Sequence, residues 1–308
     1  MPRPGLTAPG GREAGALFLA TPAMFATNLL VARALEGALP PVALAFARWT
    51  LTFLMLAPIA WVPLWRQRHV ALAEWRTLLL LGLLGMGFCG APIYQAGVTT
   101  TATNMGLIYS ASPILIVAFG ALFWRDRTGP VQIAGVVLCL GGVALVIARG
   151  APAVLLTLQV TAGDLWVALA TVSWAVYSLL IRHRPSRLDL GARFAAITLC
   201  GVLVNLPAVI AESAVLGLPA LDLRGVGIVL LLALIPGLGA FMAYNRLVAL
   251  IGPASTGLIM YLVPLYNAGL AFILLGERPQ LYHLAGAALI LPGIWLATRP
   301  VRVARRED

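Results

Sequence analysis

The segment GLIYSASPILIVAFGALFWRDRTGPVQIAGVVLCLGGVALVI, residues 106–147, recurs 151 positions later as GLIMYLVPLYNAGLAFILLGERPQLYHLAGAALILPGIWLAT, residues 257–298. Eleven of the 42 aligned positions are identical, whereas unrelated apolar segments of this composition would match at ~4 positions. The identical pairs are Gly106/Gly257, Leu107/Leu258, Ile108/Ile259, Pro113/Pro264, Arg127/Arg278, Ala134/Ala285, Gly135/Gly286, Leu138/Leu289, Leu140/Leu291, Gly142/Gly293 and Leu145/Leu296. The chain is therefore a doubled unit.

The composition around this repeat excludes a soluble globular protein. Of the 308 residues, 61% are hydrophobic and only 10% are charged, whereas soluble domains carry about 25% charged residues. Apolar runs of about 20 residues recur along almost the whole chain, and each is long enough to cross a hydrocarbon core of roughly 30 Å as a helix. The sequence thus predicts an all-α integral membrane protein.

Ten transmembrane helices are predicted, and they divide the chain into two units. The helices are expected at 14–33, 42–64, 76–95, 104–124, 130–149, 163–182, 192–212, 225–246, 254–275 and 281–298. The resulting parts are an N-terminal tail 1–13, a first five-helix repeat 14–149, a connecting loop 150–162, a second five-helix repeat 163–298 and a C-terminal tail 299–308. The first apolar run lacks a small-residue cleavage pattern, so we expect it to remain as the first span.

The arginines predict the orientation of these helices. All 21 basic residues are Arg. Sixteen fall on one side of the predicted spans and four on the other, while Arg48 lies inside a span. Because the side with excess basic residues stays in the cytoplasm, both termini are predicted to be cytoplasmic in a multi-pass protein of the inner membrane.

Five spans per unit is an odd number, so the second unit must enter the membrane in the opposite sense to the first. Such inverted repeats are related by a pseudo-two-fold axis in the membrane plane, an architecture that many carriers share. The first helices of the two units agree at an offset of 149. The offset pairs Phe25 with Trp174, Asn28 with Tyr177 and Arg33 with Arg182.

Several other function classes lack their sequence signals. The net charge of +10 comes from arginines scattered over short connections without interleaved aromatics, which suits membrane lipid headgroups and not nucleic acid. The three cysteines have no CxxC spacing and are expected to pack, so we expect no metal and no cofactor. The GxGxxG pattern at 85–90 lies within a predicted span, where close helix packing explains it. Without Lys there is no Walker lysine.

The motifs of the two units resemble those of a known family. LPPVALAFARW at 39–49, GLI…P at 106–113 and GLI…P…LLGERP…AG…G in the ninth and tenth spans resemble the EamA-type drug/metabolite transporters. The resemblance covers about residues 14–298. It implies ten helices in two inverted halves and export of small metabolites, including amino acids, by alternating access. One departure is WRDRTG at 124–129, where the second unit has LGERPQ, although Asp126 keeps the acidic position.

The fourth and ninth spans offer candidate solute contacts around two prolines. Tyr261, Pro264 and Asn267 are spaced by three residues and share a helix face. Proline within a helix removes a backbone hydrogen bond, so Pro264 is expected to kink the helix and free a carbonyl for a solute. Pro113 occupies the same place in the fourth span, and the polar side chains beside it are Tyr109 and Ser110. A kinked packing face is the alternative interpretation.

The first and sixth spans offer aromatic and polar side chains at equivalent positions. Asn28 follows Phe25 by three residues, and Tyr177 follows Trp174 by three residues. Ser173 lies one helical turn before Tyr177. Rings with a polar group nearby suit an amphipathic solute, although plain helix packing also uses this spacing.

Four further aromatic residues lie close to predicted span ends. These are Tyr94, Tyr244, Trp61 and Trp65. Tyr and Trp are enriched where a membrane meets water, so we expect these side chains to form interfacial belts.

Arg48 is the one basic residue placed within a span, about six positions or roughly 9 Å from its predicted outer end. A charge at that depth needs a partner or water. Arg48 is a candidate for holding a carboxylate of the solute. Alternatively, it is a structural tie to backbone carbonyls or to Glu277. Glu277 and Asp126 end the ninth and fourth spans, where they form either gate or capping pairs with the arginines that follow them or simple interfacial charges.

These features predict a secondary transporter that exports small amphipathic metabolites, with aromatic or other neutral amino acids preferred. Its partners would be a small-molecule solute and membrane lipids, and we expect a monomer. A nucleotide-sugar, drug or lipid-headgroup transporter of the same fold is the alternative. An integral-membrane enzyme would need clustered His, Asp or Glu at one membrane face, and a receptor or scaffold would need long loops outside the membrane. The sequence shows neither feature.

Overall fold

The computed structural model of the chain describes residues 9–34, 39–100, 105, 108–109, 111–126, 128–148, 151, 153, 161–217, 222–263, 265–266, 269–270, 273 and 280–297. These residues form helices and short connections, and none of them lies in a strand. Each of the ten predicted segments is helical at least in part among these residues. The prediction of an all-helical chain is therefore confirmed over the described part.

The helices of the first unit follow one another with short connections. They are α1 (Pro9–Ala34), α2 (Pro41–Arg66), α3 (Arg68–Ala73), α4 (Trp75–Gly82), η1 (Leu83–Phe88), α5 (Ala91–Thr99), α7 (Ser112–Trp124) and α8 (Pro130–Ile147). The short helix α3 was not predicted. It lies between two spans and has no buried residue.

The second unit repeats this order. Its helices are α10 (Ala162–His183), α11 (Leu190–Leu216), α12 (Leu223–Leu232), η2 (Ala233–Gly239), α13 (Ala240–Ile251), α14 (Pro253–Gly257), η3 (Leu258–Tyr261) and α16 (Leu281–Ala297). Five helical segments among the described residues are long and apolar enough to cross a membrane. They are Pro41–Arg66, Trp75–Thr99, Ala162–His183, Leu190–Leu216 and Gly225–Ile251. Shorter apolar helices run over Ser112–Trp124, Pro130–Leu145 and Leu281–Ala297.

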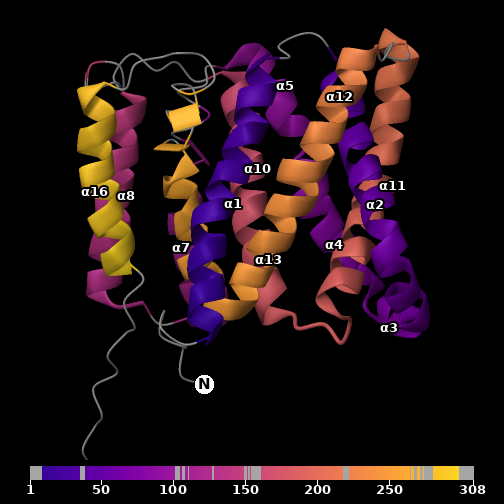
Figure 1. The fold of residues 1–308 in the computed structure, drawn as a ribbon, viewed down its shortest axis with the longest axis horizontal. Helices are drawn as coiled ribbons and strands as arrows, with labels where there is room; N and C mark the ends of the chain where they lie inside the picture. The colour runs from indigo at the N-terminus through magenta and orange to yellow at the C-terminus, as the bar shows by residue number, and fades with distance from the viewer. Residues whose placement is uncertain are drawn as a thin grey trace, which may run out of the picture.

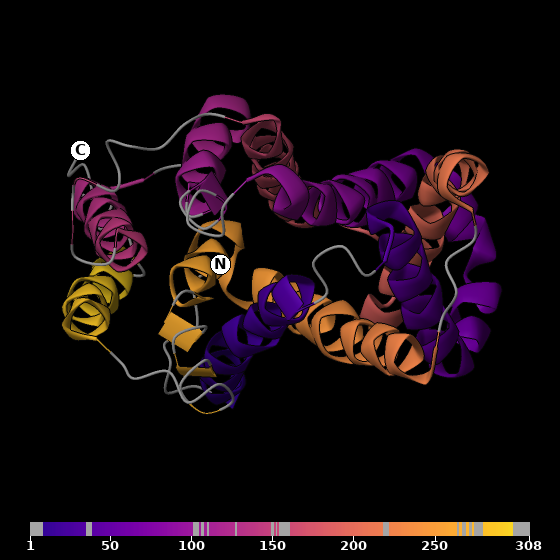
Figure 2. The same cartoon turned by 90° about the horizontal axis from the view of Figure 1, so that it is seen from above.

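The helices stand side by side in an elongated molecule (Figure 1). One end is formed by α8 and α16, and the other by α2, α11 and α12, as the view from above also shows (Figure 2). Each end thus combines helices from both units. Helices α1, α10, α7 and α13 lie between the two ends.

The pairing of α8 with α16 depends on glycines that the repeat shares. A Cβ on Gly135 would lie 2.6 Å from the carbonyl oxygen of Gly293, and a Cβ on Gly142 would lie 2.8 Å from that of Gly286. Small residues let the two backbones approach this closely. Gly135 is equivalent to Gly286, and Gly142 to Gly293, so the two contacts are copies of each other. This reciprocal pattern is that of an antiparallel pair with a local two-fold axis.

A residue on such an axis should touch its own equivalent, and Cys139 does so. Its Sγ donates to the carbonyl oxygen of Ile290 at 3.4 Å, and Ile290 is the residue 151 positions further along. The axis that relates the two units therefore passes between Cys139 and Ile290.

Helices α2 and α11 form the matching antiparallel pair at the other end of the molecule. At one end of the pair, the Glu212 carboxylate accepts hydrogen bonds from the backbone N–H groups of Val42, at 3.0 Å, and Ala43, at 2.7 Å. At the opposite end, Gln67 donates to the Asp189 carboxylate at 2.7 Å and accepts from the Asp189 N–H at 3.2 Å. The start of each helix is thus tied to the end of the other.

The third helix of each unit is interrupted by a π-helical segment at an equivalent place. In the first unit this segment is η1, and in the second unit it is η2, which contains Pro236. The segments pack crosswise, because η1 contacts α10 and α11 of the second unit whereas η2 contacts α1 and α2 of the first. Such segments often mark functional positions. Here they place the third helix of each unit against the first two helices of the other.

Two of the four predicted belt residues are buried, so this prediction is wrong for Tyr94 and Tyr244. The exposed fraction is 8% for Tyr94 and 0% for Tyr244. Proximity to the end of a span does not reveal which way a side chain faces, and α5 and α13 turn these residues toward neighbouring helices. Trp61 and Trp65, in contrast, are 50% and 57% exposed. They stack on each other along the outer face of α2, with ring centroids 5.9 Å apart.

Candidate functional site

A cluster of aromatic rings occupies the middle of the molecule where the two units meet. Phe25 on α1 lies edge to face with Trp174 on α10, with centroids 5.5 Å apart. Phe241 and Tyr244 of α13 complete the cluster, with centroids 5.4 Å and 4.5 Å from that of Trp174. Trp174 is only 2% exposed. The sequence predicts that aromatic residues of the first and sixth spans share a site, and the structure brings them together.

Phe25 and Trp174 are also equivalent residues of the two units, at the offset of 149. Since they touch each other, the axis between the units passes through this ring contact as well as through the contact of Cys139 with Ile290. Any binding site centred on these rings is therefore shared by both halves of the chain.

A polar group of the first unit lies beside the rings and contains the buried Arg48. Nη1 of Arg48 donates to Asn28 Oδ1 at 3.1 Å and to the Tyr94 hydroxyl at 2.9 Å. The Tyr94 hydroxyl in turn donates to Asn28 Oδ1 at 3.0 Å. The Arg48 guanidinium carbon lies 4.4 Å from the centroid of the Trp49 ring, a cation–π arrangement. The structure thus joins two predicted site residues, Asn28 and Arg48.

The second unit contributes a neutral polar group beside the same rings. The Tyr177 hydroxyl donates to Asn245 Oδ1 at 2.9 Å. Ser178 Oγ lies 2.6 Å from the Tyr244 hydroxyl and also donates to the carbonyl oxygen of Trp174 at 2.7 Å. All five residues are buried. The ring of Tyr177 stacks on that of Trp174, so this polar group is continuous with the aromatic cluster.

The remaining predicted residues of this region lie nearby or outside the described part. Tyr109 is partly buried and lies close enough to Arg48, Cys89 and Tyr244 to interact with each. Ser173 is buried on α10 beside Trp174. The predicted residues that lie outside the described part are Ser110, Pro264, Asn267, Glu277 and the arginines Arg127 and Arg278.

Tyr261, a predicted residue of the ninth span, lies apart from the central rings, and Pro113 lies at the start of α7. Tyr261 is fully buried, but it packs against Val136, Cys139 and Ile290 near the α8/α16 pair and not against the central rings. Its hydroxyl has no hydrogen-bond partner among the described residues. Pro113 lies in the first turn of α7, which begins at Ser112 and follows helical residues 108–109 and a turn at Ala111, so the predicted span is interrupted next to this proline. Proline is tolerated there because first-turn N–H groups have no partner within the helix.

Just beyond the end of α7, Asp126 contacts a residue of the second unit. Its carboxylate lies 3.1 Å from Nε2 of His183, at the last residue of α10. The His183 ring also stacks on Trp124, with centroids 5.0 Å apart. This contact ties the end of the fourth helix of one unit to the end of the first helix of the other.

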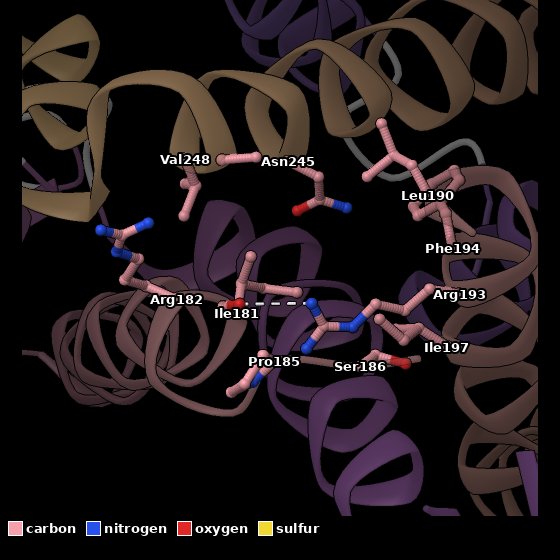
Figure 3. A pocket seen from close by; sticks show the side chains of 11 residues that line it. Ile181, Arg182, Pro185, Ser186, Leu190, Arg193, Phe194, Ile197, Asn245 and Val248 are labelled. Atoms are coloured by element: carbon pink, nitrogen blue, oxygen red, sulfur yellow. Dashed lines mark hydrogen bonds between the residues drawn. The ribbon is translucent and has the colours of Figure 1, made fainter. Parts of the chain in front are cut away.

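A pocket of about 230 Å³ opens beside the end of α10 and reaches the neutral polar group. Figure 3 shows Asn245 projecting into it from the helix above and Arg193 from the helix on the right. Arg193 donates to the carbonyl oxygens of Ile181, at 3.2 Å, and Arg184, at 2.7 Å, so its guanidinium caps the end of α10. Asn245 lines the pocket and also accepts the hydrogen bond of Tyr177, so this residue links the pocket to the neutral polar group.

Sequence reasoning missed Tyr94, Phe241, Tyr244 and Asn245 as site residues. The third helices of the two units agree at an offset of 150, which places Tyr94 on Tyr244 and Gln95 on Asn245. This equivalence of polar residues on the third helices is the sequence feature that could have identified them as site residues. Rings, hydroxyls, amides and one guanidinium can bind a small amphipathic solute. The described residues contain no group of three or more His, Cys, Asp or Glu that could hold a metal ion.

Comparison with known proteins agrees with the doubled architecture. The profile of the EamA-like transporter family matches residues 14–148 and again residues 161–299. An uncharacterized transporter of Archaeoglobus fulgidus is 26% identical over 84% of this chain and 88% of its own length. A probable terminal-alkyne amino-acid exporter of Streptantibioticus cattleyicolor is 28% identical over 86% of both chains. The inner membrane protein YtfF of Escherichia coli is 24% identical over 84% of this chain and 87% of its own.

A solved structure shares the fold. The crystal structure of another protein superimposes on this chain with a TM-score of 0.73, over 92% of this chain and 96% of that chain, at 21% sequence identity. The family profile covers nearly the whole chain in two copies, and the curated relatives align over most of their length. This chain belongs to the EamA-like transporter family of the drug/metabolite transporters, and it is an integral membrane transporter of small metabolites.

Proposed function

We propose that this transporter exports small amphipathic metabolites across the inner membrane, with aromatic or other neutral amino acids as its preferred solutes. The observation that carries this proposal is the contact of Phe25 with Trp174, which are equivalent residues of the two units, with a polar group on either side. Rings on the axis between the two halves belong to both halves. They can therefore contact the solute both when the transporter is open to one side of the membrane and when it is open to the other.

The membrane arrangement that we propose has ten spans in two inverted five-helix repeats. The antiparallel pairing of α8 with α16 and of α2 with α11 supports it, since each pair combines equivalent helices of opposite direction. With both termini in the cytoplasm, the pocket beside Arg193 would face the cytoplasm. The two halves would then rock about the central rings to expose the solute to each side alternately.

The contacts of the solute follow from the chemistry of the site. The rings of Phe25 and Trp174 would pack against its apolar part, and the polar groups around Asn28 and Tyr177 would hydrogen-bond its ends. The similarity to the probable terminal-alkyne amino-acid exporter of Streptantibioticus cattleyicolor supports the choice of amino acids. Tyr109 and Ser173 would lie at the edge of this site. Tyr261 would act from the neighbouring cluster.

Transport of nucleotide sugars, drugs or lipid headgroups by the same fold is the alternative. A nucleotide sugar carries two phosphates and would favour more than one deep cation. Arg48 is the one buried arginine among the described residues, so a solute with no more than one anionic group is favoured.

Counterflow into liposomes tests the proposal. Vesicles containing the purified protein and loaded with unlabelled phenylalanine should take up labelled phenylalanine in a saturable manner. Trp174→Ala should reduce the initial rate at least tenfold, because it removes the central ring, and the milder Trp174→Phe should reduce it less. Trp61→Ala is the matched control, since Trp61 is an exposed tryptophan outside the site.

Two results would contradict the proposal. One is the absence of saturable counterflow for phenylalanine and for a panel of the other neutral amino acids. The other is a Trp174→Ala rate equal to that of the wild type. Size-exclusion profiles of each variant would separate a loss of transport from a loss of fold.

A further inference from the structure

The two units differ in charge at one equivalent position beside the central rings. Helices α2 and α11 begin at Pro41 and Leu190, which sets their offset at 149. At this offset the residue equivalent to Arg48 is Ile197. Both side chains are buried, at 2% and 0% exposure. The first unit therefore has a cation where the second has an apolar side chain.

Contacts of the same two helices with the third helices support this equivalence. A Cβ on Gly82 of α4 would lie 2.7 Å from the backbone nitrogen of Gly201 on α11. The residue equivalent to Gly201 is Thr52 on α2, and its hydroxyl donates to the carbonyl oxygen of Ala233, at the start of η2, at 3.2 Å. The second helix of each unit thus touches the third helix of the other at matching positions.

The hydrogen bonds of Arg48 leave one edge of its guanidinium unused. Nη1 donates to Asn28 and to Tyr94, and both partners are neutral. Nε is buried without a hydrogen-bond partner, and Nη2 forms no hydrogen bond with the residues that the structure describes. Nε and Nη2 form the side-on edge through which arginine binds a carboxylate with two parallel hydrogen bonds.

A buried guanidinium without an anion is costly. The free-energy cost of removing a charge from water is offset only when a counter-charge and further hydrogen bonds accompany the buried group. The ion pairs of the described residues join His183 to Asp126 and Arg246 to Glu13, and neither involves Arg48. Within a membrane such a residue is expected to serve a solute or an ion. Asn28, Tyr94 and the Trp49 ring would hold its free edge in place.

Building on the transport function proposed above, we propose that the transported solute carries one carboxylate, which binds the Nε–Nη2 edge of Arg48. The apolar part of the solute then lies against Phe25 and Trp174. Where the solute has an uncharged polar group at its other end, such as the hydroxyl of tyrosine, that group meets the neutral pair of Tyr177 and Asn245, beside the pocket at the end of α10. The solute therefore has one orientation in the site, with its anionic end toward the first unit.

Competition with matched acids and amides tests this assignment. In the wild type, unlabelled phenylalanine should inhibit labelled phenylalanine counterflow at a concentration at least tenfold lower than phenylalaninamide, which lacks the carboxylate. Arg48→Gln should abolish this preference, because glutamine cannot form the paired charged hydrogen bonds. Arg48→Lys keeps the charge and should retain part of the preference. Arg76→Gln, at an exposed arginine, is the matched control.

Equilibrium binding provides a readout that does not depend on transport. The sodium salt of 3-phenylpropanoate should raise the melting temperature of the wild type in detergent, whereas 3-phenylpropanamide should not, and Arg48→Gln should remove the difference. A parallel loss of inhibition by the acid and the amide in Arg48→Gln would overturn the carboxylate assignment. So would equal shifts of the wild-type melting temperature by the two compounds.

The outcomes of these two measurements distinguish the inference from the proposed function. If the wild type shows no saturable counterflow of any amino acid, the proposed function fails, and the melting-temperature comparison then decides the carboxylate assignment alone. If counterflow is present and phenylalaninamide competes as well as phenylalanine, the transport function stands and the carboxylate assignment is wrong.

Discussion

Glu212 supplies the N-terminal cap that α2 lacks. The residue before this helix is Pro40, which has no side-chain acceptor, and the first residue is Pro41, which has no N–H. The first free N–H groups, those of Val42 and Ala43, donate instead to the Glu212 carboxylate at 3.0 Å and 2.7 Å. A negative charge at this end of a helix is also favoured by the helix dipole.

Replacing this carboxylate should therefore weaken the fold and not only the local helix end. We expect Glu212→Ala to lower the free energy of unfolding by about 1–2 kcal/mol, the usual value of an N-terminal cap. Glu212→Gln should cost less, because its amide oxygen still accepts one hydrogen bond. Unfolding of the purified variants in mixed detergent would measure both. Wild-type stability of Glu212→Ala would show that the cap contributes nothing.

At the same scale, the sequence identified those site residues whose equivalents are chemically similar. The sequence pairs Phe25 with Trp174 as equivalent positions at an offset of 149, both aromatic, and in the structure the two rings also touch. Tyr94 and Asn245 lie on the third helices of the two units, and the sequence did not identify them as site residues. Tyr94 bonds to Asn28 of α1, and Asn245 accepts from Tyr177 of α10, only because the third helices are rotated toward α1 and α10. That rotation is a consequence of tertiary packing, which single-helix periodicity does not contain.

The pair of α8 and α16 makes a sharper prediction because two adjacent glycines differ in their surroundings. A Cβ on Gly142 would lie 2.8 Å from the carbonyl oxygen of Gly286, whereas a Cβ on Gly141 would have no atom within 4 Å. We expect Gly142→Ala to push the helices apart and to lower stability by about 1–3 kcal/mol, the usual cost of overpacking. Gly141→Ala should be neutral or slightly stabilising, since alanine favours a helix over glycine.

Thermal unfolding of both glycine variants in the same detergent would check this prediction. Equal melting temperatures of Gly141→Ala and Gly142→Ala would contradict the close approach of α8 and α16. The repeat alone indicated that Gly142 and Gly286 matter, because each is identical to its equivalent in the other unit, Gly293 and Gly135. It did not indicate which neighbour each glycine faces.

The helical segments themselves followed from hydropathy, but their internal breaks did not. The third helix of each unit was predicted as one continuous span, whereas it contains the π-helical segment η1 or η2. These segments are as apolar as their flanks. Only the packing of Gly85 shows what η1 does, because a Cβ there would lie 2.8 Å from the Tyr177 ring. The segment allows the backbone of one unit to approach the site residue of the other.

At the scale of the whole molecule, two antiparallel pairs at opposite ends enclose the central rings. The contacts Cys139–Ile290 and Phe25–Trp174 each join a residue to its own equivalent, so both lie on one pseudo-two-fold axis. The sequence predicted the doubling from the repeat, and it predicted the inversion from the five spans expected in each unit. It did not predict that Arg48 has an uncharged equivalent in the second unit. The offset that aligns the second helices of the two units follows from where α2 and α11 begin, and the structure supplies those positions.

The proposed inversion also predicts that equivalent helix ends lie at opposite faces of the membrane. Arg66 at the end of α2 and Val215 at the end of α11 are equivalent at an offset of 149, and both are exposed. In a background in which Cys89, Cys139 and Cys200 are replaced by alanine, a membrane-impermeant maleimide should label Val215→Cys in intact cells. Arg66→Cys should be labelled only after permeabilisation, because its end of the molecule carries the excess of arginine. Labelling of both variants from the same side would mean that the two units run in the same direction, and the shared central site would then lose its basis.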